Sequence, residues 1–227
     1  MSSSSPSKEI TFLSYFPTTI YSLEAPQFLE TVGQIVNESL DKVRQDFPSD
    51  FLETAPYPMY HSHSLLEDSR IQEFANFVAQ TSWNILDSQG YAMNNFNTVI
   101  QELWAQEHHK HSLMEQHVHG GGAQIVGMYF LEVPENAPRL LIYDPRPGKV
   151  MVNLPEKDMS QATPASQMIN FEPKSGVMYF TNSWLAHSFG KNIDNAKFKF
   201  VHFNIGVVYN PQMPASECPV QPAAEVI

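Results

Sequence analysis

Met114-Glu115-Gln116-His117-Val118-His119-Gly120-Gly121-Gly122 stands near the middle of the chain, directly before an apolar run over residues 123–133. In an extended strand, residues i and i+2 point to the same face, so His117 and His119 are expected to project side by side. Two neutral imidazoles at that separation form half of a transition-metal site. The stretch therefore predicts a metal centre on a strand, with a further ligand supplied from elsewhere in the sequence.

The composition is that of a globular protein. The 227 residues are 42% hydrophobic and 16% charged, which is enough for a sizeable core. With 13 Lys and Arg against 24 Asp and Glu, the formal net charge of −11 opposes a nucleic-acid partner. No run reaches the length of a membrane span, and the N-terminal residues lack the apolar core of a secretion signal. We therefore expect no membrane partner, and a small molecule, peptide or protein as substrate.

Cys218 is the single cysteine of the chain. One cysteine cannot form an internal disulfide, so we expect a reducing compartment, the cytoplasm. It also excludes a zinc site built on several thiolates, which leaves histidines and carboxylates as candidate ligands.

Two helices are expected in the first part of the chain. Apolar residues keep helical spacing from Pro26 to about Phe47, and proline suits a first helical turn. A second helix is expected from about Asp68 to Asp87, with Gly90 as the residue that ends it. Residues 10–21 are interpreted as one or two short edge strands and residues 48–66 as a loop.

The sequence after Gly90 consists of short apolar runs separated by turn residues, which is typical of a sandwich or barrel. The fold class that we expect is mainly β, a double-stranded β-helix (a jelly-roll or cupin-like core) flanked by about two α-helices. The predicted strands are Phe96–Gln106, Gln124–Val133, Arg139–Tyr143, Val150–Asn153, Gln167–Phe171, Val177–Thr181 and Lys197–Tyr209.

We expect a single domain over residues 1–227, because no repeat or linker divides the chain. Its expected parts are a disordered tail (1–9), a helical flank with edge strands (10–90), the jelly-roll core (91–210) and a Pro-rich tail (211–227).

His187 is the candidate third ligand, because it follows a predicted strand and precedes the long last one. A jelly roll can bring two ligands on one strand next to a third from a distant strand. His61-Ser62-His63 has the same spacing, but neither a glycine turn nor an apolar strand follows it. Residues 108–111, with three histidines and a lysine, are interpreted as an exposed loop, because neighbouring strand residues face opposite ways.

The block from Trp104 to Tyr209 resembles the iron(II)- and 2-oxoglutarate-dependent oxygenases. Within them it most closely resembles a branch often encoded by cyanobacterial viruses and marine bacteria. The motifs that carry the resemblance are Trp104, His117-Val118-His119, Gly127-Met128-Tyr129-Phe130-Leu131, Asp144-Pro145-Arg146, Pro173-Lys174-Ser175-Gly176, Ser183-Trp184-Leu185-Ala186-His187 and Phe203-Asn204.

This resemblance implies a distorted jelly roll that holds iron(II) by three side chains, here His117, His119 and His187. 2-Oxoglutarate would take two further positions on the ion, and O2 the last one. The expected activity is a dioxygenase, a hydroxylase that couples decarboxylation of 2-oxoglutarate to oxidation of the substrate. If the protein is encoded by a virus, the expected compartment is the cytoplasm of the host.

The ligand set departs from the wider family at His119, where most members have Asp or Glu. A neutral ligand gives the site one negative charge less, which should weaken iron(II) binding. Asp144 is an alternative carboxylate ligand, although Asp-Pro-Arg-Pro-Gly is also typical of a turn.

The residue that binds the distal carboxylate of 2-oxoglutarate is the second departure. Counting about ten residues from His187, where the family has a basic residue, leads to Lys197, whereas counting back from Phe203-Asn204 leads to Phe198. The apolar residues change parity along this strand, so we expect a bulge near Phe200 that lets Lys197 or Lys199 point into the pocket. Two solvated lysines are the alternative.

Tyr129 and Asn192 are further candidates for polar contacts to the cosubstrate. The aromatic residues Trp104, Trp184 and Tyr179 are expected in the core or in the pocket wall, with the core as the default.

Two other functions fit the same residues. One is a three-histidine, cupin-like metal dioxygenase that does not use 2-oxoglutarate. The other is a jelly-roll protein without catalytic activity, which serves structure or interaction.

Overall fold

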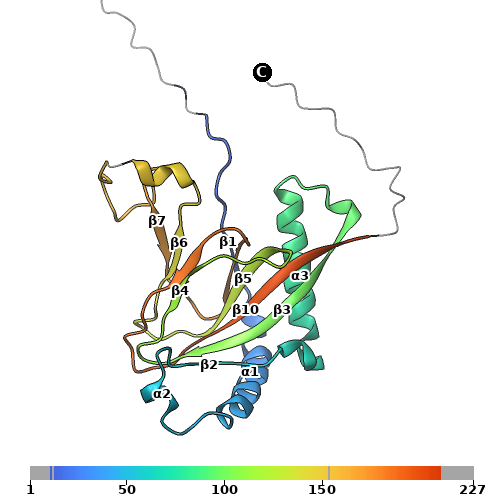
Figure 1. The fold of residues 1–227 in the computed structure, drawn as a ribbon. Helices are drawn as coiled ribbons and strands as arrows, with labels where there is room; N and C mark the ends of the chain where they lie inside the picture. Colours follow the sequence, from blue (N-terminus) through green and yellow to red (C-terminus); the bar gives the residue numbers. More distant parts are fainter. Residues whose placement is uncertain (1–10, 12, 153, 211–227) are drawn as a thin grey trace, which may run out of the picture.

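Two antiparallel sheets face each other in the computed structural model, which describes residues 11, 13–152 and 154–210 (Figure 1). The first sheet contains, in order, β1 (Tyr21–Glu24), β8 (Val177–Asn182), β5 (Ala123–Glu132), β10 (Phe198–Tyr209), β3 (Phe96–His108) and β2 (Met59–His61). The second contains β4 (Met114–His117), β9 (His187–Phe189), β6 (Leu140–Tyr143) and β7 (Met168–Phe171). The predicted fold class, mainly β with a jelly-roll core, is confirmed.

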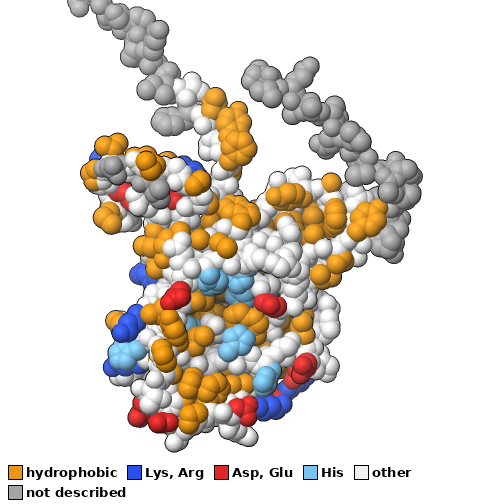
Figure 2. All heavy atoms as spheres, viewed as in Figure 1, with side chains coloured by type: hydrophobic (Ala, Val, Ile, Leu, Met, Phe, Trp, Pro, Cys, Tyr) orange, Lys and Arg blue, Asp and Glu red, His pale blue; other side chains and the backbone are white. Residues whose placement is uncertain are grey.

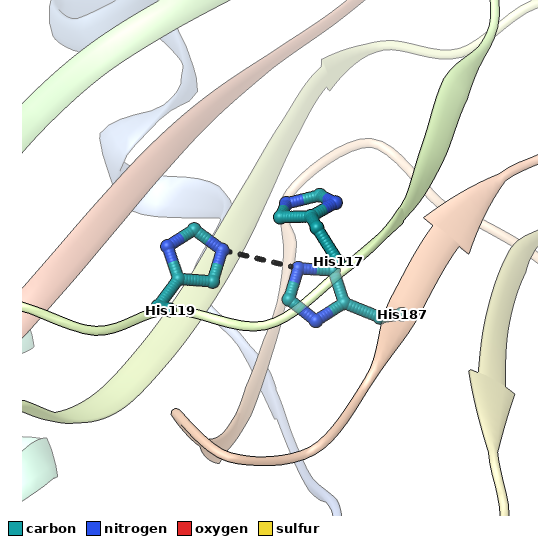
Figure 3. Close-up of side chains that lie close together, drawn as sticks. All are labelled: His117, His119 and His187. Atoms are coloured by element: carbon teal, nitrogen blue, oxygen red, sulfur yellow. Dashed lines mark hydrogen bonds between the residues drawn. The ribbon is translucent and has the colours of Figure 1, made fainter.

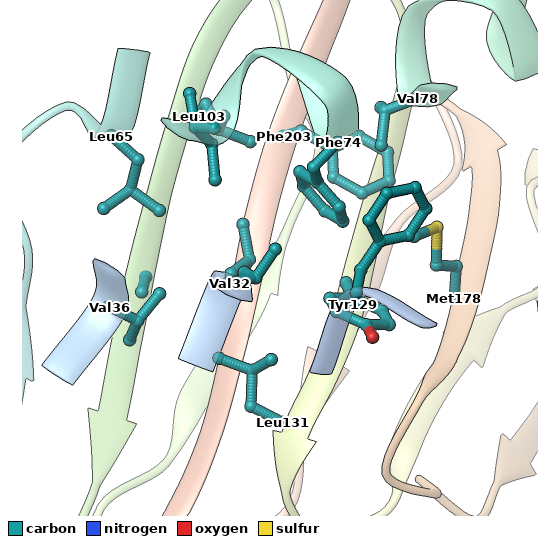
Figure 4. Close-up of a cluster of buried hydrophobic side chains, with 14 of the residues drawn as sticks. Val32, Val36, Leu65, Phe74, Val78, Leu103, Tyr129, Leu131, Met178 and Phe203 are labelled. Atoms are coloured by element: carbon teal, nitrogen blue, oxygen red, sulfur yellow. The ribbon is translucent and has the colours of Figure 1, made fainter. Parts of the chain in front are cut away.

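Helices α1 (Leu29–Arg44) and α3 (Gln72–Ser88) cover the outer face of the six-stranded sheet (Figure 1). Their apolar residues pack with the outward side chains of β3, β5, β8 and β10 in one cluster, part of which is drawn in Figure 4. Gly90 takes a left-handed conformation, with φ of +93°, just after α3. Both predicted helices and the glycine that ends the second are confirmed.

Short helices lie between the larger elements. They are α2 (Phe51–Thr54) and the 3-10 helices Pro26–Phe28, Leu65–Glu67, Ser69–Ile71, Met93–Asn95 and Pro147–Met151. In the described residues, no helix has the length and apolar character needed to cross a membrane.

Strand β10 is buried on both faces. Val201, Phe203 and Ile205 pack under the helices, whereas Phe198 and Phe200 lie between the two sheets. The apolar residues change from even to odd positions along the sequence because both faces of the strand are apolar. The side chains do not switch from one face to the other.

A bulge is present near Phe200, as predicted, but its extra residue belongs to the neighbouring strand β5. Lys199 pairs with Glu132 and Phe200 pairs with Phe130, so Leu131 of β5 is the extra residue. The side chains of β10 keep alternating through this point.

Three predicted segments differ from the structure. Residues 48–66 contain α2 and the edge strand β2, which pairs with β3 and was too short to show a period. In residues 10–21, no strand is found before Tyr21 among those that the structure describes. The predicted strand Val150–Asn153 is wrong, because Pro147 opens a 3-10 helix there, and residue 153 lies outside the described part.

The predicted tails, residues 1–9 and 211–227, lie outside the described residues. The expectation of a single domain stays a prediction.

An ion network joins α1 to the outer face of the sheet. The carboxylate of Glu107, with a fully buried side chain, accepts from Arg44 at 2.6 Å and from His109 at 2.8 Å, and lies 3.3 Å from Lys197 and from Lys199. Burial by itself would raise the pKa of Glu107. The hydrogen bond from His109 and the positive charges of Arg44 and the two lysines outweigh it and hold this pKa well below its usual range.

We predict that Gly127→Ala strongly destabilises the protein. A Cβ atom at Gly127 would lie 2.3 Å from the ring of Phe203 and 2.6 Å from the carbonyl oxygen of Tyr179, so β5, β8 and β10 would have to move. The expected loss is about 3 kcal/mol in the free energy of unfolding, measured by denaturant titration. The matched control is Gly120→Ala, which meets nothing within 4 Å. Equal stability of the two variants would contradict the packing described for β5.

We predict that Glu107→Gln costs about 3 kcal/mol at neutral pH, because it leaves the buried Lys199, and with it Arg44 and Lys197, without their counter-charge. A carboxyl with a lowered folded pKa stabilises above its unfolded pKa and loses that effect as pH falls. The difference from wild type should therefore shrink below about pH 4.5. Urea titrations at several pH values measure it. The control is Glu132→Gln, which also touches Lys199 but is half exposed, so a loss below about 1 kcal/mol is expected. A difference that does not change with pH would contradict the ion network.

Candidate metal centre

Three histidines meet where β4 ends and β9 begins. His117 closes β4 and lies directly opposite His187, the first residue of β9, so both side chains emerge on the same face. His119 follows in the next loop. One nitrogen from each ring lies within 4.8 Å of the other two, and Figure 3 shows the three rings converging. The structure thus brings together the three residues that the sequence singles out.

Backbone carbonyls orient two of the imidazoles. Nδ1 of His117 lies 2.7 Å from the carbonyl oxygen of Glu115, and Nδ1 of His187 lies 3.0 Å from that of Leu185. A carbonyl can only accept, so each Nδ1 carries the proton and each Nε2 keeps its lone pair. Such a bond from the second ring nitrogen is what fixes the tautomer of a metal-binding histidine.

His119 is held differently. Its Nε2 lies 3.4 Å from Nε2 of His187, the contact drawn as a dashed line in Figure 3, and no backbone carbonyl in the described residues orients its ring. Two nitrogens that share a metal ion at 2.0–2.1 Å each are themselves about 3 Å apart. The spacing of this pair therefore fits two ligands of one ion.

Burial favours the neutral form of His119 and of His187. It lowers the pKa of His119 to about 4, an effect that the charge of His117 increases and that of Glu102 opposes. It also lowers the pKa of His187 to about 4. Neutral imidazoles with free lone pairs are the ligands that iron(II) and similar ions accept. The donor set fits such an ion, with the remaining positions open to other ligands.

The glycine run makes the turn between the ligands and β5. Gly121 and Gly122 adopt φ of +64° and +88°, a region that favours glycine. The backbone N–H of His119 donates to the carbonyl oxygen of Ser183 at 2.9 Å, and the hydroxyl of Ser183 donates to Ala123 at 2.6 Å. The turn before His187 thereby fixes the loop that carries His119.

Asp144, the alternative ligand, is engaged elsewhere. Its carboxylate accepts from the backbone N–H of Arg146 at 3.0 Å and from the guanidinium at 2.6 Å, within its own turn. Hydrogen bonds from Arg146 lower the pKa of Asp144. Among the described residues, the metal-binding group consists of histidines alone.

The four residues predicted to contact the cosubstrate lie away from the histidines. Lys199 points outward, donating to Asn37 of α1 at 2.6 Å and to Glu132 at 2.7 Å. Lys197 is half exposed beside Glu107. The hydroxyl of Tyr129 donates to the carbonyl of Ala25 under the helices. Asn192 is buried in a loop, and its side chain donates to the carbonyl oxygens of His108 and Ala196. Their predicted contacts to a cosubstrate stay predictions without a supporting geometry.

The interior beyond the histidines is filled by aromatic rings. Phe198, where one register of the family resemblance places a basic residue, is fully buried among Phe130, Phe189 and Phe200, with ring centroids 5.3 to 5.8 Å away. Lys199, the one Lys or Arg among the buried side chains of the described residues, points to α1 on the outer side of β10. The described interior thus offers no cation to the distal carboxylate of 2-oxoglutarate.

His108 extends this aromatic interior. It is buried as the last residue of β3, and its ring bonds to Ser112 and Gln106, so the prediction of an exposed loop at this position is wrong. The ring of Trp184, expected in the core by default, is 51% exposed.

A column of rings in contact reaches the metal centre from the edge strand β2. It runs from His61 to Trp104 (4.1 Å between centroids), His202 (4.3 Å), His119 (4.8 Å) and His187 (5.2 Å). Sequence reasoning missed His202. The alternation along β10 could have found it, since position 202 shares its face with Phe198 and Phe200.

Comparisons with known proteins agree with this geometry. Residues 102–204 match the family described as "Putative 2OG-Fe(II) oxygenase". The match contains all three histidines and covers a little under half of the 227 residues. No curated protein matches the chain. The narrower resemblance to a viral and marine bacterial branch stays a prediction.

Solved structures share the fold at low sequence identity. The Pseudomonas putida prolyl-4-hydroxylase has a TM-score of 0.54 at 8% identity, covering 82% of this chain and 92% of that one. HygX from Streptomyces hygroscopicus, with nickel, 2-oxoglutarate and hygromycin B bound, gives 0.52 at 12%, covering 83% of each chain. SnoN, an alpha ketoglutarate dependent epimerase from nogalamycin biosynthesis, gives 0.50 at 14%, covering 92% and 89%.

The chain spans 54% of the length of another similar structure, a 2OG-Fe(II) oxygenase family oxidoreductase from Burkholderia pseudomallei (TM-score 0.39, 12% identity, 63% of this chain covered). The likeness to the three structures with TM-scores of 0.50 to 0.54 shows a shared jelly-roll architecture.

We predict that His187→Ala and His117→Ala each weaken binding of cobalt(II) by about a hundredfold or more, because each removes an oriented nitrogen. His119→Ala should weaken it less, since no backbone carbonyl fixes that ring. Anaerobic titration followed by visible absorption measures the affinities. His63→Ala, an exposed histidine outside the group, is the control. Unchanged affinity in His187→Ala would rule out this centre.

Proposed function

We propose that this protein is a non-haem iron(II)-dependent oxygenase that uses 2-oxoglutarate and O2, and that it hydroxylates its substrate. The observation that carries the proposal is the group of three imidazoles on the inner face of a jelly roll, with nitrogens within 4.8 Å of one another. The match of residues 102–204 to the oxygenase family supports it.

The ligands, the carbonyls that orient them and the buried rings behind them would have different roles in this activity. His117, His119 and His187 would hold iron(II), which activates O2 when 2-oxoglutarate supplies two of the electrons. The carbonyls of Glu115 and Leu185 keep two lone pairs aimed at the ion. The buried rings behind the site exclude water from the reacting groups.

Hydroxylation is the first choice among the reactions of this fold. One similar structure is a prolyl-4-hydroxylase, and another is an epimerase, so the architecture serves more than one outcome. We propose a small molecule, peptide or protein as the substrate and the cytoplasm as the compartment, the latter because of the single cysteine.

A dioxygenase that works without 2-oxoglutarate is the second candidate. The observation in its favour is Phe198, which fills the interior where a basic residue is expected, while Lys197 and Lys199 bind carboxylates on the outer side. A three-histidine site needs no cosubstrate if the substrate itself binds the ion and supplies the electrons.

Spectroscopy and product analysis separate these candidates. Anaerobic addition of iron(II) and then 2-oxoglutarate should give a weak visible charge-transfer band, and admission of O2 should release succinate. His187→Ala should abolish both, whereas His63→Ala should leave both intact. Iron binding without the band, together with O2 consumption without succinate, would favour the second candidate. Succinate release that survives in His187→Ala would contradict the proposed centre.

A further inference from the structure

A row of polar side chains lies beside the metal centre with unfilled hydrogen bonds. His202 is 1% exposed, and neither of its ring nitrogens has a partner. Asn204, 7% exposed, has no partner for its Oδ1. Both lie on the inner face of β10, and the ring of His202 stacks on His119 with 4.8 Å between the centroids.

Buried polar atoms without partners cost free energy, because they lose the hydrogen bonds that they made to water in the unfolded chain. Native proteins leave few of them, and those that remain mark places where a water molecule or a ligand binds. Three such atoms on two neighbouring inward residues, next to a candidate metal centre, point to a bound group.

Glu102 completes the row. It pairs with Asn204 across β3 and β10, and its carboxylate accepts from Nδ2 of Asn204 at 2.6 Å. This bond fixes the orientation of the amide, because only the nitrogen can donate to a carboxylate. In the described residues, no Lys, Arg or His forms an ion pair with Glu102, and its charge acts on His119 and His61.

Acceptors outnumber donors in this row. A neutral imidazole at His202 offers one donor and one acceptor, Asn204 offers its oxygen, and Glu102 offers an exposed carboxylate. Figure 2 shows histidine side chains on the surface of this face with carboxylates on both sides of them. A carboxylate ligand would find one donor here and a like charge. A group rich in N–H donors would find acceptors and a counter-charge.

Charge balance at the metal centre leaves Glu102 free for this role. Three neutral imidazoles around a divalent ion carry a charge of +2, and the two carboxylates of 2-oxoglutarate cancel it. The negative charge of Glu102 then has no counter-charge in the described site.

We propose that Glu102, Asn204 and His202 bind an ammonium group of the prime substrate and thereby place the neighbouring carbon atoms at the metal centre. The inference rests on the proposed function, whose prime substrate it assigns to the class of amines. Glu102 supplies the charge and Asn204 and His202 supply directional acceptors.

Three four-carbon probes of matched length test the assignment: 1,4-diaminobutane, 1,4-butanediol and succinate. Each is titrated calorimetrically into the full chain loaded with zinc(II) and 2-oxoglutarate, a combination that cannot turn over. NMR of 15N-labelled histidine follows the ring nitrogens of His202. We expect the diamine to bind and to shift the His202 signals, and Glu102→Gln to weaken its binding about tenfold. Succinate binding should not weaken in this variant.

The control variant is Glu73→Gln, which removes a charge from an exposed residue in the first turn of α3, on the outer side of the six-stranded sheet. Its affinity for the diamine should equal that of wild type. Diamine binding that does not change in Glu102→Gln, or that weakens equally in both variants, would overturn the assignment. A His202 signal that moves with succinate or the diol but not with the diamine would overturn it as well, and so would the absence of binding by all three probes.

This outcome is separate from that of the proposed function. The charge-transfer band and succinate release report on iron and 2-oxoglutarate, whereas the zinc titration needs no turnover. If the band is absent, the same titration without 2-oxoglutarate still tests the amine site.

Discussion

Strand β10 has no solvent-facing side along its buried length, and the rest of the structure depends on this constraint. Its odd-numbered residues from Val201 to Ile205 pack against the apolar side chains of the helices and must therefore be apolar themselves. Its even-numbered residues set the contents of the barrel: phenylalanines at one end, then His202 and Asn204 at the other. One alternating strand therefore decides which part of the interior is aromatic and which part is polar.

Much of this could be predicted from the sequence, because the signals are local. The spacing of His117 and His119, the glycines that follow and the periodicity of the two helices each involve few residues. The surroundings of Lys197 and Lys199 could not be predicted in the same way. When a strand is apolar on both faces, its sequence does not show which residues face the helices and which face the interior. In addition, Lys199 binds Asn37 and Glu132, which lie in distant segments of the sequence.

The replacement of a carboxylate by His119 changes how the site is built, and not only its charge. A carboxylate would be held by hydrogen bonds, whereas an imidazole offers a flat face. Here that face lies against His202, with 23° between the ring planes, and the ring of His119 is parallel to that of His187 within 4°. Stacking thus restrains the plane of this ring, whereas the hydrogen bonds to carbonyls also fix which nitrogen of the other two rings faces the site. The ligand and the strand behind it are adapted to each other.

The column of rings has a consequence for how the centre can be observed. Trp104 is separated from His119 only by the ring of His202, with centroid steps of 4.3 and 4.8 Å. An open-shell ion bound at the histidines would therefore lie close enough to an indole to quench its fluorescence. A closed-shell ion of the same charge would not quench it. Quenching of tryptophan fluorescence, to which Trp104 contributes beside Trp83 and Trp184, would therefore report the binding of an open-shell ion without dye, label or substrate.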